Sequence, residues 1–206
     1  MDIPLDFSVQ AVAVIAGFAI CLLSFNWGMY RFFTIPNGSN TGIDAIKLVG
    51  TCFGLGSLIA LPVLGVTSPI ACGLALLLCA SSLALFWWAI RTNRRKPLSF
   101  AFSDDLPEHL VCEGPYRRIR HPFYTAYLLS WLVTPVATAE PLMLVPFAVM
   151  AAIYTAAARV EERKFEATRL GEAYARYRSV AGMFWPRACL SEAGEPASIA
   201  SSSSKE

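Results

Sequence analysis

The sequence predicts an all-α protein, a multi-pass integral membrane helical bundle with about five transmembrane helices and a C-terminal helical extension. Hydrophobic residues make up 55% of the 206 residues and charged residues only 16%, and the mean hydropathy is +0.50. A soluble domain carries about 25% charged residues. The charges are also bunched, which leaves apolar runs of the roughly 20 residues that cross a bilayer.

The basic residues predict how this bundle is oriented. Every Lys and Arg lies in 31–47, in 91–120 or between 159 and the C-terminus. If each apolar run is a helix, all three stretches fall on one side of the membrane, which the positive-inside rule makes cytoplasmic. We therefore expect the N-terminus outside and the C-terminus in the cytoplasm.

Three transmembrane helices are expected within residues 1–90, at about 7–30, 43–66 and 70–90. Turn-forming residues separate the first two, because Pro36 and the Asn37-Gly38 pair favour a turn. Only Thr67-Ser68-Pro69 separates the second helix from the third, so these two should pack antiparallel.

Residues 91–186 form the second predicted region. It holds a cytoplasmic loop up to residue 120, a helical hairpin with arms at about 122–136 and from 141 to beyond 159, and a C-terminal helix. Helical composition continues past the second arm as far as Gly171. Residues 187–206 are rich in Ser, Ala and Glu, which predicts a disordered tail.

The first group of candidate functional residues lies in 108–124, which reads EHLVCEGPYRRIRHPFY. This polar, turn-rich segment sits between two apolar runs and contains both histidines of the chain, His109 and His121, with three arginines between them. Guanidinium groups are costly to place unpaired in hydrocarbon. The concentration indicates a functional site, although a basic loop that only fixes topology gives the same charge pattern.

The second group is Arg159, Glu161 and Glu162, where the last long helix leaves the membrane. Residues 159 and 162 are one helical turn apart and share a face. Because the hairpin arms run antiparallel, this group should lie at the same depth as His121. The alternative is an ordinary ion pair between Arg159 and Glu162 at the membrane surface.

The cysteines and histidines do not suggest a metal centre. Six cysteines show no CxxC or zinc-type spacing, and neither histidine belongs to an HExxH pattern. Four of the cysteines lie in apolar runs, where a cysteine behaves as a small hydrophobic residue. We expect no disulfide framework, no metal site and no nucleic-acid partner.

Three segments together resemble the isoprenylcysteine carboxyl methyltransferase family and the related membrane phospholipid methyltransferases. They are GPYRRIRHPFY (114–124), the acidic pair Glu161-Glu162, and GEAYARYRSVAGMFWP (171–186). The likeness covers about the C-terminal half of the chain. It implies a methyltransferase that takes its methyl group from S-adenosyl-L-methionine, which we call the donor.

The resemblance also implies which residues form the site. The positions that match the family's donor contacts are Glu108, His109, Leu110, Val111, Tyr116, His121, Pro122, Phe123, Tyr124 and one of Glu161 and Glu162. Arg159 would face the methyl acceptor, and Arg159, Glu161 and Glu162 are the candidate catalytic residues. One extra residue between the acidic pair and Gly171 leaves open which glutamate binds the donor. The ending SVAGMFWP also departs from the more basic, proline-bearing ending common in the eukaryotic enzymes.

The acceptor is expected to be a lipid or lipidated molecule, with an isoprenylcysteine-type carboxylate as the main hypothesis. A carboxylate needs only a guanidinium such as Arg159 to orient it. An amine, as in a phospholipid N-methyltransferase, must lose a proton, for which Glu161, Glu162 or His121 are candidates. An NADPH-dependent sterol-type membrane reductase and a non-catalytic membrane scaffold or transport component are also compatible with the sequence.

Overall fold

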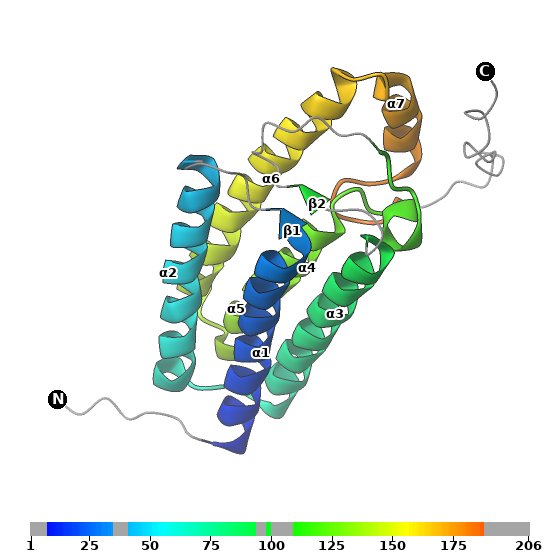
Figure 1. Ribbon diagram of the computed structural model, residues 1–206. Helices are drawn as coiled ribbons and strands as arrows, with labels where there is room; N and C mark the ends of the chain where they lie inside the picture. The colour runs from blue at the N-terminus through cyan, green and yellow to red at the C-terminus, as the bar shows by residue number, and fades with distance from the viewer. Residues whose placement is uncertain (1–7, 35–40, 94–97, 100–108, 188–206) are drawn as a thin grey trace.

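The computed structural model describes residues 8–34, 41–93, 98–99 and 109–187, and these form a bundle of long helices (Figure 1). By length and composition, four stretches of the described residues could cross a membrane: Val9–Phe32, Asp44–Leu64, Pro69–Asn93 and Pro141–Glu166. They correspond to α1 (Val9–Phe32), α2 (Thr41–Leu64), α3 (Pro69–Asn93), and the turn η2 (Pro141–Met143) with α6 (Leu144–Glu166). The predicted all-α, multi-pass membrane bundle is confirmed.

The helix predicted at 122–136 is broken into two pieces. α4 (Pro122–Trp131) and α5 (Val133–Thr138) meet at Leu132, whose N–H donates to the Leu129 carbonyl in an i−3 bond of 3.3 Å. Pro135 has no N–H with which to continue the α-helical ladder across this point. The prediction of one continuous helix was therefore wrong.

Together α4 and α5 still run the full length of α3. At one end, Asn93 of α3 hydrogen-bonds Tyr116 of η1 (Gly114–Arg117), close to the start of α4. At the other end, the Thr67 N–H, in the turn between α2 and α3, donates to the Ala137 carbonyl at 3.0 Å. α4 and α5 together therefore span the bundle from one end to the other, as the sequence predicted for a transmembrane helix at about 122–136.

The core lies where α1 and α3 pack against each other and against α4. Phe18 and Phe86 are fully buried there. Gly28 of α1 lets this approach happen, because a Cβ at that position would lie 2.5 Å from the Phe86 ring. Small residues at such points bring membrane helices close together.

Several chain segments gather at the end of the bundle where α1 and α3 finish. Two short strands, β1 (Phe33–Thr34) and β2 (Leu98–Ser99), pair in parallel there. Past the end of α6, α7 (Gly171–Val180) folds back over the same end (Figure 1). This end, which we call the polar end, carries the site.

The segment after α7 is pinned to the loop that precedes α4. The Gly182 N–H donates to the Arg118 carbonyl at 3.0 Å, and the Arg120 N–H donates to the Gly182 carbonyl at 2.8 Å. These bonds join positions more than 60 residues apart, so they hold the loop before α4 in one place. Residues 188–206, most of the predicted disordered tail, lie outside the described residues.

Candidate active site

His121 stands at the centre of the polar end. It precedes α4 as its N-cap residue, and Pro122 at the first helical position is suited to starting a helix there. Its main-chain N–H donates to the Met183 carbonyl at 3.1 Å. Its ring reaches across to α6, where Nδ1 lies 3.1 Å from Glu161 Oε2 and Nε2 lies 3.2 Å from Glu162 Oε1.

These contacts determine the charge of the His121 ring. A carboxylate can only accept hydrogen bonds, so a ring that contacts one at each nitrogen must donate from both and is an imidazolium. Burial opposes this charge, but the hydrogen bonds and negative charges of Glu161 and Glu162 outweigh burial. The pKa of His121 is therefore raised above its ordinary value.

Glu162 is the most deeply held charge of the site. Its side chain is 5% exposed, and Arg120 Nε, itself on a 7% exposed side chain, donates to Oε1 at 2.9 Å. Arg178 of α7 lies 3.9 Å from Oε2. Arg120 also donates to the Ala181 carbonyl. We call the set Arg120, His121, Glu162 and Ala181 the inner clamp, because it joins α6, the loop before α4 and the segment after α7.

Glu161 is less enclosed than its neighbour. It accepts hydrogen bonds from the Tyr124 hydroxyl at 2.7 Å and from His121, while its side chain stays 27% exposed. Successive helix positions differ in direction by about 100°. Glu162 therefore points into the inner clamp while Glu161 keeps an open side.

A stack of aromatic rings continues from His121 into the bundle. Tyr124 lies over His121 with ring centroids 5.7 Å apart, and Tyr154 lies over Tyr124 at 5.2 Å with an interplanar angle of 11°. Trp131 Nε1 donates to the Tyr154 hydroxyl at 3.4 Å. Phe184 packs on the other flank of His121, at 6.2 Å. The Glu161 carboxylate thus contacts this stack at the ring edges, through the Tyr124 hydroxyl and His121 Nδ1.

The structure brings together four of the residues that the resemblance implied: His121, Tyr124, Glu161 and Glu162. It places the others more loosely. Pro122 is buried, and Phe123 packs on Phe86 of α3. His109 is exposed, Val111 is half-buried, and Leu110 packs against the buried tyrosines of α7. Glu108 lies outside the described residues.

Arg159 lies apart from this cluster. It is exposed although Glu162, one turn further along α6, is buried. The ion pairs that Glu162 makes within the described residues run to Arg120, His121 and Arg178. The surface ion pair considered for Arg159 and Glu162 is not what holds Glu162.

Two residues that contribute to the site, Asn93 and Tyr154, were missed from the sequence, and Arg120 was recognised only as one of three loop arginines. Tyr154 had a usable signal, because it precedes Glu161 by seven residues, which is two turns along one helix face. No local pattern pairs Arg120 with Glu162 or Asn93 with Tyr116, because these partners are 42 and 23 residues apart in the chain. Among the described residues, no group of His, Cys, Asp and Glu is arranged to hold a metal ion.

Comparison with known proteins shows to which family the chain belongs. A model of the phospholipid methyltransferase family matches residues 70–173, which is half of the chain. The chain belongs to the phospholipid methyltransferase family. The match begins in α3 and ends in α7, so it contains His121, Glu161 and Glu162 but not the segment after α7 that completes the inner clamp.

A curated relative of this phospholipid methyltransferase family member is the methanethiol S-methyltransferase of Pseudomonas sp. (strain GM41(2012)). The two are 31% identical over 160 residues, which cover 70% of this chain and 58% of the relative. The chain therefore spans less than two thirds of that relative's length. The resemblance to membrane methyltransferases is confirmed, and the reductase hypothesis has no support from these comparisons.

The inner clamp makes a prediction about stability. Glu162→Gln keeps the shape of the side chain but leaves Arg120 and His121 without a buried counter-charge, which should cost about 3–5 kcal/mol. Glu166→Gln is the matched control, because Glu166 pairs with Arg178 while half exposed, and such pairs contribute about 0–1 kcal/mol. Thermal unfolding in detergent should separate the two variants clearly, and equal midpoints would contradict the clamp.

His121 predicts how stability changes with pH. A histidine whose pKa is raised on folding stabilises the fold fully below its unfolded pKa of about 6.5, and this stabilisation is lost as the pH rises through the folded pKa. The difference in thermal midpoint between wild type and His121→Gln should therefore shrink from about pH 6 to about pH 9. A difference that stays constant or grows would show that the ring is not charged in the folded protein.

Proposed function

We propose that the protein is an integral membrane methyltransferase that uses S-adenosyl-L-methionine and acts at the cytoplasmic side of the membrane. The family match supports the reaction class, and the observation that carries the donor assignment is Glu161. Its carboxylate has an open side and lies at the edge of an aromatic stack. A carboxylate and aromatic faces are suited to a sulfonium and an ammonium group.

The residues present fit the two positive charges of the donor, its sulfonium and its ammonium. Glu161 would hold the cationic part, and the Tyr124 hydroxyl and His121 Nδ1 would keep its carboxylate in place. When bound, the donor supplies a methyl group on a positively charged sulfur, ready for transfer to a nucleophile. The chain's own contribution is to bind, orient and exclude water, because such a transfer depends mainly on alignment.

The charges of the site favour an acceptor that needs no proton removed. Glu161, Glu162 and His121 are all engaged with one another, and Glu162 is also paired with Arg120. None of the three is a free base. An acceptor carboxylate of the isoprenylcysteine type, on a lipid or lipidated molecule, therefore suits the site better than the amine of a phospholipid. Arg159, exposed at the end of α6, is the proposed partner of that carboxylate.

A thiol is the second candidate acceptor. The named activity of the Pseudomonas relative is S-methylation of methanethiol. A free thiol has a pKa of about 8.5 and attacks as its thiolate, so a thiol, unlike a carboxylate, must first release its proton to water. The same site therefore suits a thiol only when the thiol arrives as the thiolate.

The distribution of basic residues supports the proposed orientation. Exposed arginines lie at the polar end on α1, α3, η1 and α7: Arg31, Arg91, Arg117 and Arg176. Under the positive-inside rule this end faces the cytoplasm, and the N-terminus lies outside.

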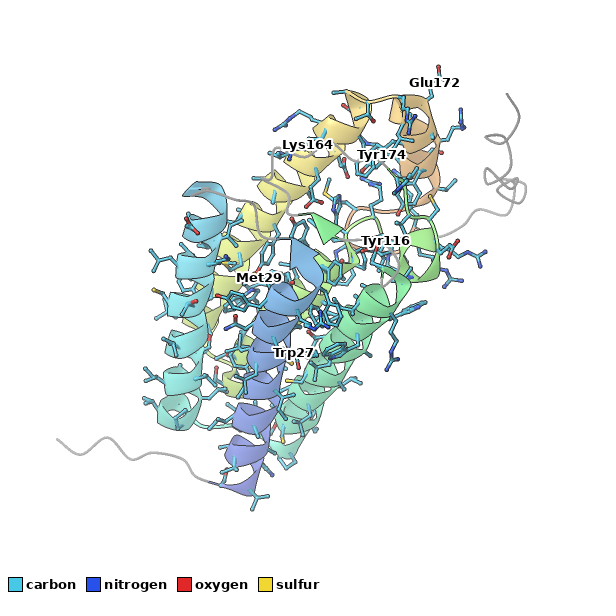
Figure 2. All side chains as sticks on the ribbon, in the orientation of Figure 1. Trp27, Met29, Tyr116, Lys164, Glu172 and Tyr174 are labelled. Carbon is cyan, nitrogen blue, oxygen red and sulfur yellow. The ribbon has the colours of Figure 1, made fainter. Side chains whose placement is uncertain are left out.

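Binding of the donor tests the role of Glu161. Glu161→Gln removes the charge that faces the donor and one of the two carboxylates that contact His121, so affinity for S-adenosylmethionine should fall at least about 10-fold while the thermal midpoint falls less than in Glu162→Gln, which also loses the ion pair with Arg120. Glu172→Gln is the matched control, because Glu172 is exposed on α7 and points away from the bundle (Figure 2). Calorimetry on purified protein in detergent gives both values, and unchanged affinity in Glu161→Gln would overturn the assignment.

Product chemistry tests the acceptor. The protein is incubated with methyl-labelled S-adenosylmethionine and either a prenylated cysteine, a phospholipid mixture or a small thiol. A carboxylate acceptor gives an ester whose label is released by mild base, whereas thioether and amine products keep the label and are separated by chromatography. Transfer only to phospholipid amines would overturn the preference for an anionic acceptor. Stabilisation by NADPH and not by S-adenosylmethionine would overturn the methyltransferase proposal.

A further inference from the structure

A groove lies between α2 and α6 on the side of the bundle, apart from the site at the polar end. Its cavity volume is about 260 Å³. α2 stands at the edge of the bundle, with α6 next to it (Figure 1). We call this cavity the outer groove. The residues that form it come from α2, from η2 and from the first turn of α6: Phe53, Gly56, Ser57, Leu142, Met143 and Val145.

The medium around the outer groove is the hydrocarbon of the membrane. Its α2 residues belong to the membrane-crossing stretch Asp44–Leu64, and its other residues belong to Pro141–Glu166. On the same two stretches, Leu55, Ile59 and Leu144 are exposed apolar side chains. An apolar cavity of roughly 150 Å³ stays dry and takes up small apolar molecules. The outer groove is larger than that and lies in a lipid-facing surface, so it is suited to hydrocarbon.

The depth of the outer groove determines which lipid reaches it. Val145 precedes Glu161 by 16 residues of α6, which is about 24 Å at 1.5 Å per residue. The hydrocarbon core of a bilayer is about 30 Å thick, so the chains of one leaflet reach about 15 Å. A molecule with its head group beside Glu161 therefore falls short of the groove. The chain of a lipid in the opposite leaflet reaches it.

The inner wall of the outer groove is joined to the deep end of the aromatic stack. The Phe53 ring meets the Trp131 ring edge-on, with centroids 6.4 Å apart. Trp131 is buried and donates to the hydroxyl of Tyr154, which is also buried. Gly56 keeps part of the groove open, because a Cβ added there would meet no atom within 4 Å. Whatever fills the groove therefore packs against the support of Trp131.

We propose that the outer groove binds one acyl chain of a phospholipid from the leaflet opposite the polar end. This inference goes beyond the proposed function and does not depend on it. The occupant is a chain and not a helix, because a helix with its side chains is about 10–12 Å across and the groove is too small for it. The bound chain packs on Phe53 and so holds Trp131 and Tyr154 in place.

Filling the groove with a side chain tests whether lipid binds there. The full chain is purified in detergent, depleted of lipid and titrated with dioleoylphosphatidylcholine, which should raise the thermal midpoint of wild type by at least about 3 °C. The rise should be largely lost in Gly56→Leu, whose side chain takes the place of the acyl chain. Gly73→Leu is the matched control, because Gly73 is an exposed glycine of α3 whose added Cβ also meets no atom within 4 Å. It should keep the full rise.

A fluorescent reporter in the groove tests where the chain lies. Phe53→Trp places an indole in the wall of the groove, and its emission is obtained by subtracting that of wild type. In nanodiscs of phosphatidylcholine brominated along its chains, this emission should be quenched. Adding Gly56→Leu to Phe53→Trp should relieve the quenching, and adding Gly73→Leu should not.

The outcomes are distinct. The site is overturned if lipid raises the midpoint of Gly56→Leu as much as that of Gly73→Leu, or if the quenching is the same in both. Conversion of a dimer to a monomer by Gly56→Leu would assign the groove to a second copy of the chain. Relief of quenching by an added prenylated cysteine would assign it to the methyl acceptor and overturn the opposite leaflet.

If Gly56→Leu does not fold, Gly56→Ala and Gly73→Ala allow the same comparison with a smaller side chain. The proposed function stands or falls separately, because these measurements contain no S-adenosylmethionine. A protein that binds S-adenosylmethionine but shows no lipid effect loses only the acyl-chain site. A protein with the lipid effect but no affinity for S-adenosylmethionine loses only the proposed function.

Discussion

The polar end of this protein is organised by the pairing of one buried negative charge, that of Glu162, with positively charged side chains. Glu162 is nearly inaccessible to water, and a charge in that position requires paired opposite charge and hydrogen bonds. Arg120 and His121 supply both, and they come from a loop that the segment after α7 holds in register. Because buried Glu162 on α6 must be paired with positive charge, the start of α4 and the segment after α7 are held close to it.

Two adjacent glutamates consequently do different work. Glu162 turns into the inner clamp and acts on the architecture, whereas Glu161 faces the aromatic stack with part of its carboxylate accessible. His121 touches both and couples them, because one ring nitrogen serves each carboxylate. His121 therefore links the inner clamp to the proposed donor site, so a change at either glutamate acts on both stability and ligand binding.

A bundle of long apolar helices can still assemble a polar site, because the site is built beyond the apolar stretches, near helix ends. The end of α3 and the start of α4 lie at the polar end, and α6 passes them with Glu161 and Glu162 before it continues to α7 (Figure 1). Main-chain groups that helix ends leave unpaired are available there. The aromatic stack then extends from that polar level into the apolar interior, which suits an acceptor with a hydrocarbon portion and a charged head.

The sequence by itself determined the fold class, the membrane character and the family of the protein. It also located the two segments around His121 and Glu161 that form the candidate site. Hydropathy, charge distribution and motif sequence are local properties of the chain, so they can be recognised without the structure. The sequence did not determine which glutamate is buried, since both have the same neighbours in the chain and differ only in the direction they face. Nor did it reveal Arg120 or Asn93 as partners of the site. Those roles follow from contacts between distant segments, and only the tertiary structure decides which side chains must compensate one another once water is excluded.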